Sequence, residues 1–168
     1  FAATLVSLGL AVAMAAAWHG LRRMATLRGL LPLVLAIPHV ALAFALAFVM
    51  APAGFLARLV SPWATGWATP PDVPTVGDPW GIAMVLGLLP KETGFLLLMI
   101  AVALGQVRAR RTLAVATGLG YGPVAAWLKV VFPQVWPQIR LPVYVVLAYA
   151  LSVVDVALVL GPQNPPTL

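Results

Sequence analysis

Four residues that ionise or exchange protons lie within strongly apolar parts of this sequence. Lys91 and Glu92 stand in "LLPKETGFLLL", His39 follows a proline in "LAIPHVAL", and Asp155 lies in "SVVDVALVL". Ionisable side chains inside a bilayer are costly and often mark a solute or ion path. The chemistry to consider is therefore ion binding, proton transfer or solute contact. We treat His39, Lys91, Glu92 and Asp155 as candidates for a translocation path.

Each candidate also has a purely structural explanation. Lys91 and Glu92 are adjacent in sequence, so on a helix they do not face one another, and a break at the membrane interface would explain them as well. His39 follows Pro38, where a structural hydrogen bond beside a kink is the simpler role. Asp155 can pair with a neighbouring helix, face the path or lie near water. These alternatives remain open.

Other kinds of chemistry find no support in the residue types. The chain has no cysteine, and its two histidines are far apart, so neither a disulfide framework nor metal-ligand spacing is indicated. Paired carboxylates and the HExxH and GxSxG patterns are absent, which leaves an intramembrane enzyme unsupported. The phosphate-binding pattern GxxxxGK[ST] is also absent, so nothing in this sequence predicts nucleotide binding.

The composition predicts an integral membrane protein. Hydrophobic residues make up 62% of the 168 residues and charged residues only 8%, whereas soluble domains carry roughly 25% charged residues. The formal net charge is +6, but the basic residues stand at the ends of apolar runs. That distribution is typical of membrane topology and argues against nucleic acid as a partner.

The apolar runs predict an all-α, polytopic membrane protein. A helix of 23 residues is about 35 Å long, enough to cross a hydrocarbon core of roughly 30 Å. Phe1 stands inside an apolar run without a methionine before it, so we expect a piece of a longer protein. The predicted membrane spans are residues 1–18, 29–51, 80–107 and 141–160.

Basic residues occupy alternate connections between these runs, which predicts the orientation. Three arginines lie between the first two runs, and five basic residues lie in the connection 108–140. By the positive-inside rule both connections are cytoplasmic. The connection 52–78 has one arginine and two aspartates, so we expect it outside.

The connection 108–140 contains strong helix-breaking signals. "GYGP" predicts the end of one helix and the start of another, because proline suits a first helical turn. "VAAWLKVV" then predicts a short helix with Val124, Trp127, Leu128 and Val131 on one apolar face. We expect Phe132–Pro133 to end it. A two-turn helix of this kind suits docking in a partner's groove.

The stretch "GLGYGPVAAWLKVVFPQVWPQIRLP" resembles the cytoplasmic loop of permease subunits in binding-protein-dependent ABC importers. That family's motif begins Glu-Ala-Ala, with a glycine three residues after the second alanine. Matched on Gly120, Pro123 and Pro133, the Glu-Ala-Ala falls on residues 114–116, where only Ala116 is kept and the acid is missing.

The resemblance extends to the flanking runs. "TLVSLGLAVAMAAA" and "LPLVLAIPHVALAFALAF" are similar to the family's first two core helices. "PKETGFLLL" and "SVVDVALVLGPQNPPTL" resemble the branch that imports thiamine, ferric iron and related solutes. In that family a further core helix follows, so the chain would be an incomplete permease domain of the bacterial inner membrane.

The resemblance implies a transport subunit, not an enzyme, that works by alternating access. Its partners would be cytoplasmic ATPase subunits, a second permease subunit or half, a periplasmic solute-binding protein and membrane lipid. The chain would need no cofactor, because ATP and Mg²⁺ would bind to the ATPase. The coupling residues would be Ala116, Gly120, Tyr121, Gly122, Pro123, Trp127, Leu128 and Pro133.

A secondary transporter is the alternative function. In it Lys91, Glu92 and Asp155, with His39, would form an ion or proton relay. This alternative predicts transport without an ATPase.

Overall fold

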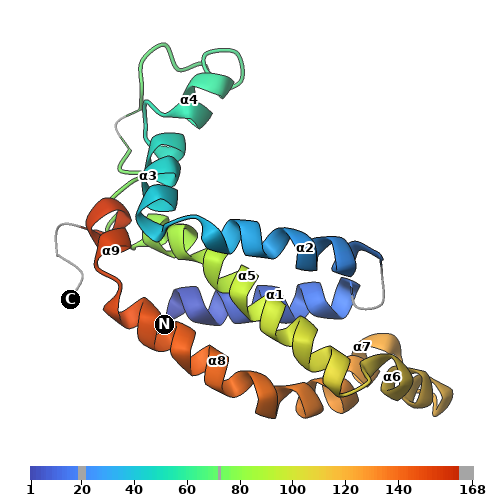
Figure 1. Cartoon of the computed structure of the whole chain (residues 1–168). Helices are drawn as coiled ribbons and strands as arrows, with labels where there is room; N and C mark the ends of the chain where they lie inside the picture. Colours follow the sequence, from blue (N-terminus) through green and yellow to red (C-terminus); the bar gives the residue numbers. More distant parts are fainter. Residues whose placement is uncertain (19–21, 72, 163–168) are drawn as a thin grey trace. The chain divides into compact units, whose positions relative to one another are not determined.

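The computed structural model describes residues 1–18, 22–71 and 73–162 (Figure 1). Every regular element in these residues is a helix, which confirms the all-α prediction. In chain order the elements are α1 (Ala2–Trp18), α2 (Arg22–Ala36), α3 (His39–Met50), α4 (Phe55–Val60), α5 (Ile82–Gln106), α6 (Ala109–Gly118), α7 (Pro123–Ala126), the π-helix η1 (Trp127–Val131), α8 (Phe132–Ser152) and α9 (Asp155–Leu160).

The chain forms two compact units. The first contains residues 1–36 and 90–151, and the second contains residues 37–89 and 152–168, described as far as residue 162. The first unit therefore holds α1, α2, most of α5 and nearly all of α8, whereas the second holds α3, α4, the start of α5 and α9.

The first unit has one apolar core shared by α1, α2, α5, α6, η1 and α8. Its largest fully buried side chains include Leu96, Leu97, Ile100 and Ile139. The buried side chains of α1 are all small, which lets neighbouring helices approach closely. They recur at helical spacing and are Ala3, Thr4, Ser7, Ala11 and Ala15.

The second unit is built on the packing of α3 against α9. Gly87, near the start of α5, is buried against α9, where a Cβ would overlap the side chain of Leu160 and stand 3.4 Å from Val156. The backbone N–H of Gly77 donates to the carbonyl of Leu160 at 3.3 Å. These contacts hold the segment that precedes α5 against the end of α9.

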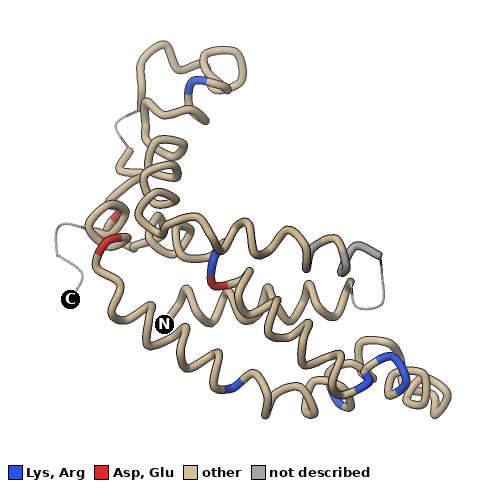
Figure 2. Tube along the Cα trace, in the orientation of Figure 1, with Lys and Arg blue, Asp and Glu red and all other residues tan. Residues whose placement is uncertain are grey.

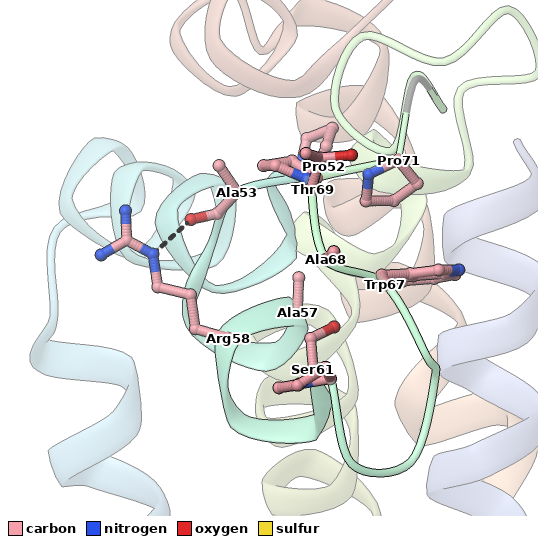
Figure 3. A pocket seen from close by; sticks show the side chains of 11 residues that line it. Pro52, Ala53, Ala57, Arg58, Ser61, Trp67, Ala68, Thr69 and Pro71 are labelled. Carbon is pink, nitrogen blue, oxygen red and sulfur yellow. Dashed lines mark hydrogen bonds between the residues drawn. The ribbon is translucent and has the colours of Figure 1, made fainter.

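The loop between α3 and α5 is held by its own contacts. The Arg58 guanidinium donates from Nε to the carbonyl of Ala53 at 2.8 Å, and the hydroxyls of Ser61 and Thr65 are 2.7 Å apart. A hollow of about 310 Å³ lies between α4 and the proline-rich segment near Trp67 (Figure 3). The connection 52–78 therefore contains the short helix α4.

Three helical segments in the described residues have the length and composition to cross a membrane. They are His39–Val60 with 22 residues, Ile82–Gln106 with 25 and Pro123–Ser152 with 30. The first combines α3 and α4, and the third combines α7, η1 and α8. Ala2–Trp18 is a shorter apolar helix. These segments support the predicted polytopic membrane protein.

The apolar run 29–51, predicted as one span interrupted by Pro32 and Pro38, is divided between two helices. Helix α2 ends at Ala36 and α3 begins at His39, with Pro38 in an extended conformation at φ −57° and ψ 141°. Proline pushes the preceding residue out of helical geometry, so the first helix ends before Ile37. Pro32, in contrast, lies within α2.

The last apolar run, 141–160, also differs from the prediction. It contains the end of α8, a break at Val153–Val154 and the short helix α9. Asp155 begins α9, where a negative charge in the first turn is favourable. The helix that precedes the break extends much farther toward the N-terminus than residue 141.

Candidate functional site

Helix α6 ends in a glycine turn, as "GYGP" predicts. Gly120 has φ +89°, and its N–H donates to the carbonyl of Thr117 at 3.0 Å, while the N–H of Tyr121 donates to Ala116 at 3.1 Å. This pair of hydrogen bonds is a Schellman motif, which needs a left-handed residue that glycine supplies without strain. The turn confirms the predicted helix break and fixes where the chain leaves α6.

The next helix begins at Pro123 but does not end at Phe132–Pro133. The N–H of Phe132 donates to the carbonyl of Trp127, five residues earlier, so the chain passes through a π turn and continues as α8. The wider turn changes the hydrogen-bond register just before Pro133, which has no N–H to donate. The side-chain amide of Gln134 donates to the carbonyl of Val130 at 2.7 Å.

Trp127 is a core residue, so it packs within the chain, which the sequence left open beside the partner contact that the resemblance implies. Its side chain is 2% exposed and belongs to the apolar core of the first unit. Its ring stacks on Phe132 with centroids 5.8 Å apart, and Phe132 lies 6.0 Å from Trp136. Trp127 therefore anchors the start of the long helix internally, and it offers no exposed surface for a partner.

Five apolar side chains on α6, the glycine turn and the start of the next helix remain exposed. We call them the loop surface: Val115, Leu119, Tyr121, Val124 and Leu128. A shallow hollow of about 340 Å³ borders the surface and is lined by Val115, Leu119 and Tyr121 together with Ala116 and Val130. Beneath it α6 packs against α7 and η1.

Basic residues surround the loop surface. Arg108, Arg110, Arg111 and Lys129 are all exposed, and Figure 2 shows lysine and arginine positions gathered around α6 and the start of the following helix. Charged side chains are expensive within hydrocarbon. The cations beside this apolar surface therefore argue against a position within the lipid core.

Lys91 and Glu92 both lie inside α5 and are buried, at 7% and 4% exposed. The hydroxyls of Thr4 and Ser7 on α1 lie beside the Glu92 carboxylate. None of these four side-chain oxygens makes a hydrogen bond of normal geometry among the described residues, although the two hydroxyls lie close enough to interact with the carboxylate. Glu92 thus belongs to a buried polar cluster with Thr4 and Ser7, which we call the α1–α5 polar cluster.

The other two predicted path residues stand elsewhere in the chain. His39 is the first residue of α3 and Asp155 is the first residue of α9, so both belong to the second unit. Asp155 is exposed, and His39 is half-buried. The described contacts place Glu92 with the two hydroxyls of α1.

Comparison with known proteins identifies a membrane transport protein that is similar to this chain. The inner membrane ABC transporter permease protein YnjC of Escherichia coli (strain K12) is 37% identical over 138 residues, which is 82% of this chain. The chain is a homologue of part of an ABC transporter permease. No protein-family model matches the sequence, and no solved structure matches it.

The match covers 25% of the E. coli permease, so the chain spans about a quarter of the length of this relative. The relationship and the membrane-length helices together confirm the predicted multi-pass protein of the inner membrane. The assignment to the branch that imports thiamine and ferric iron stays a prediction.

The hydroxyls of Thr4 and Ser7 are functional candidates that the sequence reasoning missed. Their apolar surroundings in "TLVSLGLAVA" directed attention to the hydrophobic residues. A signal was present: Thr4, Ser7, Ala11 and Ala15 recur at helical spacing and form a face of small residues. Such a face predicts close helix packing, and it places the two hydroxyls toward a neighbour.

Asp78 is a second residue whose role becomes visible only in the structure. Its carboxylate accepts hydrogen bonds from the backbone N–H groups of Ile82 and Ala83, both at 2.8 Å, at the start of α5. Burial alone would raise its pKa, but the backbone N–H donors outweigh that effect and hold the pKa of Asp78 below its ordinary value. Asp78 is therefore a helix cap with its charge favoured.

Proposed function

We propose that this chain is part of the membrane-spanning permease of an ATP-driven solute importer, and that the loop surface docks on a cytoplasmic ATPase subunit. The observation that carries the proposal is the loop surface itself. Leu119 and Val124 are 75% and 71% exposed within a basic region. Burying a large apolar side chain contributes roughly 1.5–3 kcal/mol, so this surface favours a partner.

The continuity of the helix gives this surface a mechanical role. Pro123–Ser152 is helical over 30 residues, so the segment that holds Val124 and Leu128 is continuous with a membrane-length helix. Trp127 and Val131 anchor its first turns in the apolar core. A displacement applied to the loop surface would move the start of α8 with it, which is what alternating access driven by an ATPase requires.

The proposal also assigns roles to the partner proteins. ATP and Mg²⁺ bind to the ATPase, a second permease subunit or half completes the path, and a periplasmic binding protein delivers the solute. Residues 52–78 face outside, and α6 with the loop surface faces the cytoplasm. By its resemblance to one branch of the family, we propose a solute of the thiamine or ferric-iron class.

Uptake by the reconstituted full-length transporter tests this proposal. Proteoliposomes should accumulate the solute when the binding protein is outside and ATP is supplied to the ATPase face. Dissipating the proton gradient while ATP is kept high should leave uptake intact. Uptake that needs no ATP and stops when an ion gradient is removed would replace this proposal with a secondary transporter.

That second function has one observation in its favour. Lys91 and Glu92 are buried within a membrane-length helix, and buried ionisable residues in such helices commonly belong to ion or proton pathways. In a relay, Glu92→Gln should abolish gradient-driven uptake.

A further inference from the structure

The α1–α5 polar cluster lacks the partners that buried polar atoms normally have. Glu92 is 4% exposed, Thr4 is 3% exposed and Ser7 is fully buried. Both carboxylate oxygens of Glu92 and both hydroxyl oxygens are without hydrogen bonds to any part of the chain that the structure describes. Buried polar atoms left in this state indicate a water or an ion that completes the site. The cluster is therefore a candidate binding site for a small ligand.

The donor atoms indicate which ligand fits. All four are oxygens, one carboxylate pair and two hydroxyls, and such donors suit hard cations more than soft metals. The cluster supplies a single negative charge, which a monovalent cation neutralises and a divalent cation would over-compensate in a low-dielectric core. Ala3 and Ala11 are buried on the same face of α1 as the two hydroxyls.

We propose that Thr4, Ser7 and Glu92 bind a sodium ion between α1 and α5. The ion would join the two helices, because its ligands come from both, and it would neutralise Glu92 within the membrane. The proposal does not rest on the docking role of the loop surface, since α1 and the middle of α5 hold the site.

Two other charges must be considered beside Glu92. Lys91 is the preceding residue, but consecutive positions on a helix do not face one another, and Lys91 is engaged in an interaction of its own. The amino group of Phe1 attracts the carboxylate through its charge, but that charge does not exist wherever another residue precedes Phe1 in the full-length protein. The binding experiment therefore uses the full-length protein.

Binding of radioactive sodium to the purified full-length protein in detergent tests the site. At neutral pH, with choline chloride holding the ionic strength constant, the parent should bind about one sodium ion per chain, and sodium should raise its Tm relative to choline. Glu92→Gln should lose both effects, because the neutral amide cannot balance the ion. Ser7→Ala removes one neutral ligand, so it should weaken sodium binding by about tenfold or more while the protein still folds.

Thr117→Ala is the matched control for Ser7→Ala, because it removes one hydroxyl from an exposed position outside the cluster. It should bind sodium like the parent. Sodium binding that persists in both Glu92→Gln and Ser7→Ala would overturn the proposal, as would a parent that binds no sodium. A parent whose Tm ignores sodium but rises on Glu92→Gln substitution would show that Glu92 holds a proton instead.

Discussion

The backbone N–H of Phe132 donates to the carbonyl of Trp127, five residues earlier, and the rings of the same two residues stack with centroids 5.8 Å apart. This relationship joins the segment after the glycine turn to α8 without a break. It also divides the predicted apolar face, because Trp127 and Val131 point into the core while Val124 and Leu128 remain exposed. Substitutions of the buried pair should therefore lower stability, whereas substitutions of the exposed pair should weaken docking on a partner.

Trp127→Ala should destabilise the protein, whereas Leu128→Ala should not. Removing a fully packed tryptophan leaves a cavity and costs about 3–5 kcal/mol in free energy of unfolding. Leu128 is 51% exposed, and exposed substitutions usually change stability by less than about 0.5 kcal/mol. Thermal unfolding of both variants in detergent measures the difference. Equal stability of the two variants would contradict the internal anchor.

Two neighbouring glycines should respond differently to alanine. Gly120→Ala places a side chain at φ +89°, which should cost about 1–2 kcal/mol through backbone strain. Gly122→Ala is the control, since its φ is −63° and a Cβ at either position would meet nothing within 4 Å. Comparing the Tm of the two variants separates the effect of backbone conformation from the effect of steric overlap. A Gly122→Ala variant as unstable as Gly120→Ala would disprove the Schellman assignment.

Gly87→Ala should loosen the second unit. The new methyl group would overlap the side chain of Leu160, which is fully buried, so the cost of overpacking should be about 1–3 kcal/mol. Gly105→Ala is the control on the same helix, because a Cβ there would meet nothing within 4 Å. Proteolysis near α9 should become faster only in Gly87→Ala. Unchanged protection of that region would argue against the packing of α9 on α5.

The pH dependence of stability should contain a contribution from Asp78. Its pKa is lowered in the folded state, so its stabilising effect is fully present above the ordinary value of 3.8 and is lost as the pH falls below that value toward the folded pKa. Asp78→Ala should cost about 0.5–2 kcal/mol at neutral pH, in the range of a lost helix cap. Its Tm should then fall less steeply than that of the parent between pH 5 and about 3. Parallel Tm profiles would exclude this role.

The sequence was most informative where hydrophobic periodicity and turn residues agree. Apolar runs predicted α1 and α5 to within a few residues, and "GYGP" predicted the turn between α6 and α7. Proline was less informative, because its effect depends on the hydrogen-bond register around it. Pro38 separates two helices, whereas Pro133 lies within a continuous helix after a π turn.

The polar cluster could not be predicted from composition. Thr4 and Ser7 meet Glu92 across 85 or more residues of chain, and only the packing of α1 on the core brings them together. The burial of Trp127 could not be predicted either. Helical spacing predicts which residues share a face of the helix, but it does not predict which of them another helix covers. The side chains that another helix covers are set by tertiary packing.

Recovery of the ATPase with the full-length permease tests the central claim most directly. The double variant Val124→Ser and Leu128→Ser removes exposed apolar groups and should keep the Tm near that of the parent, because neither residue is in the core. A control with Leu59→Ser and Val73→Ser makes the same kind of change in the loop predicted to lie outside. After co-expression, the control should retain the ATPase, even at high salt, where exposed ion pairs are screened. The loop variant should lose most of the ATPase and of the solute-stimulated ATP hydrolysis. Full recovery of the ATPase with normal hydrolysis in the loop variant would contradict the coupling role of this surface.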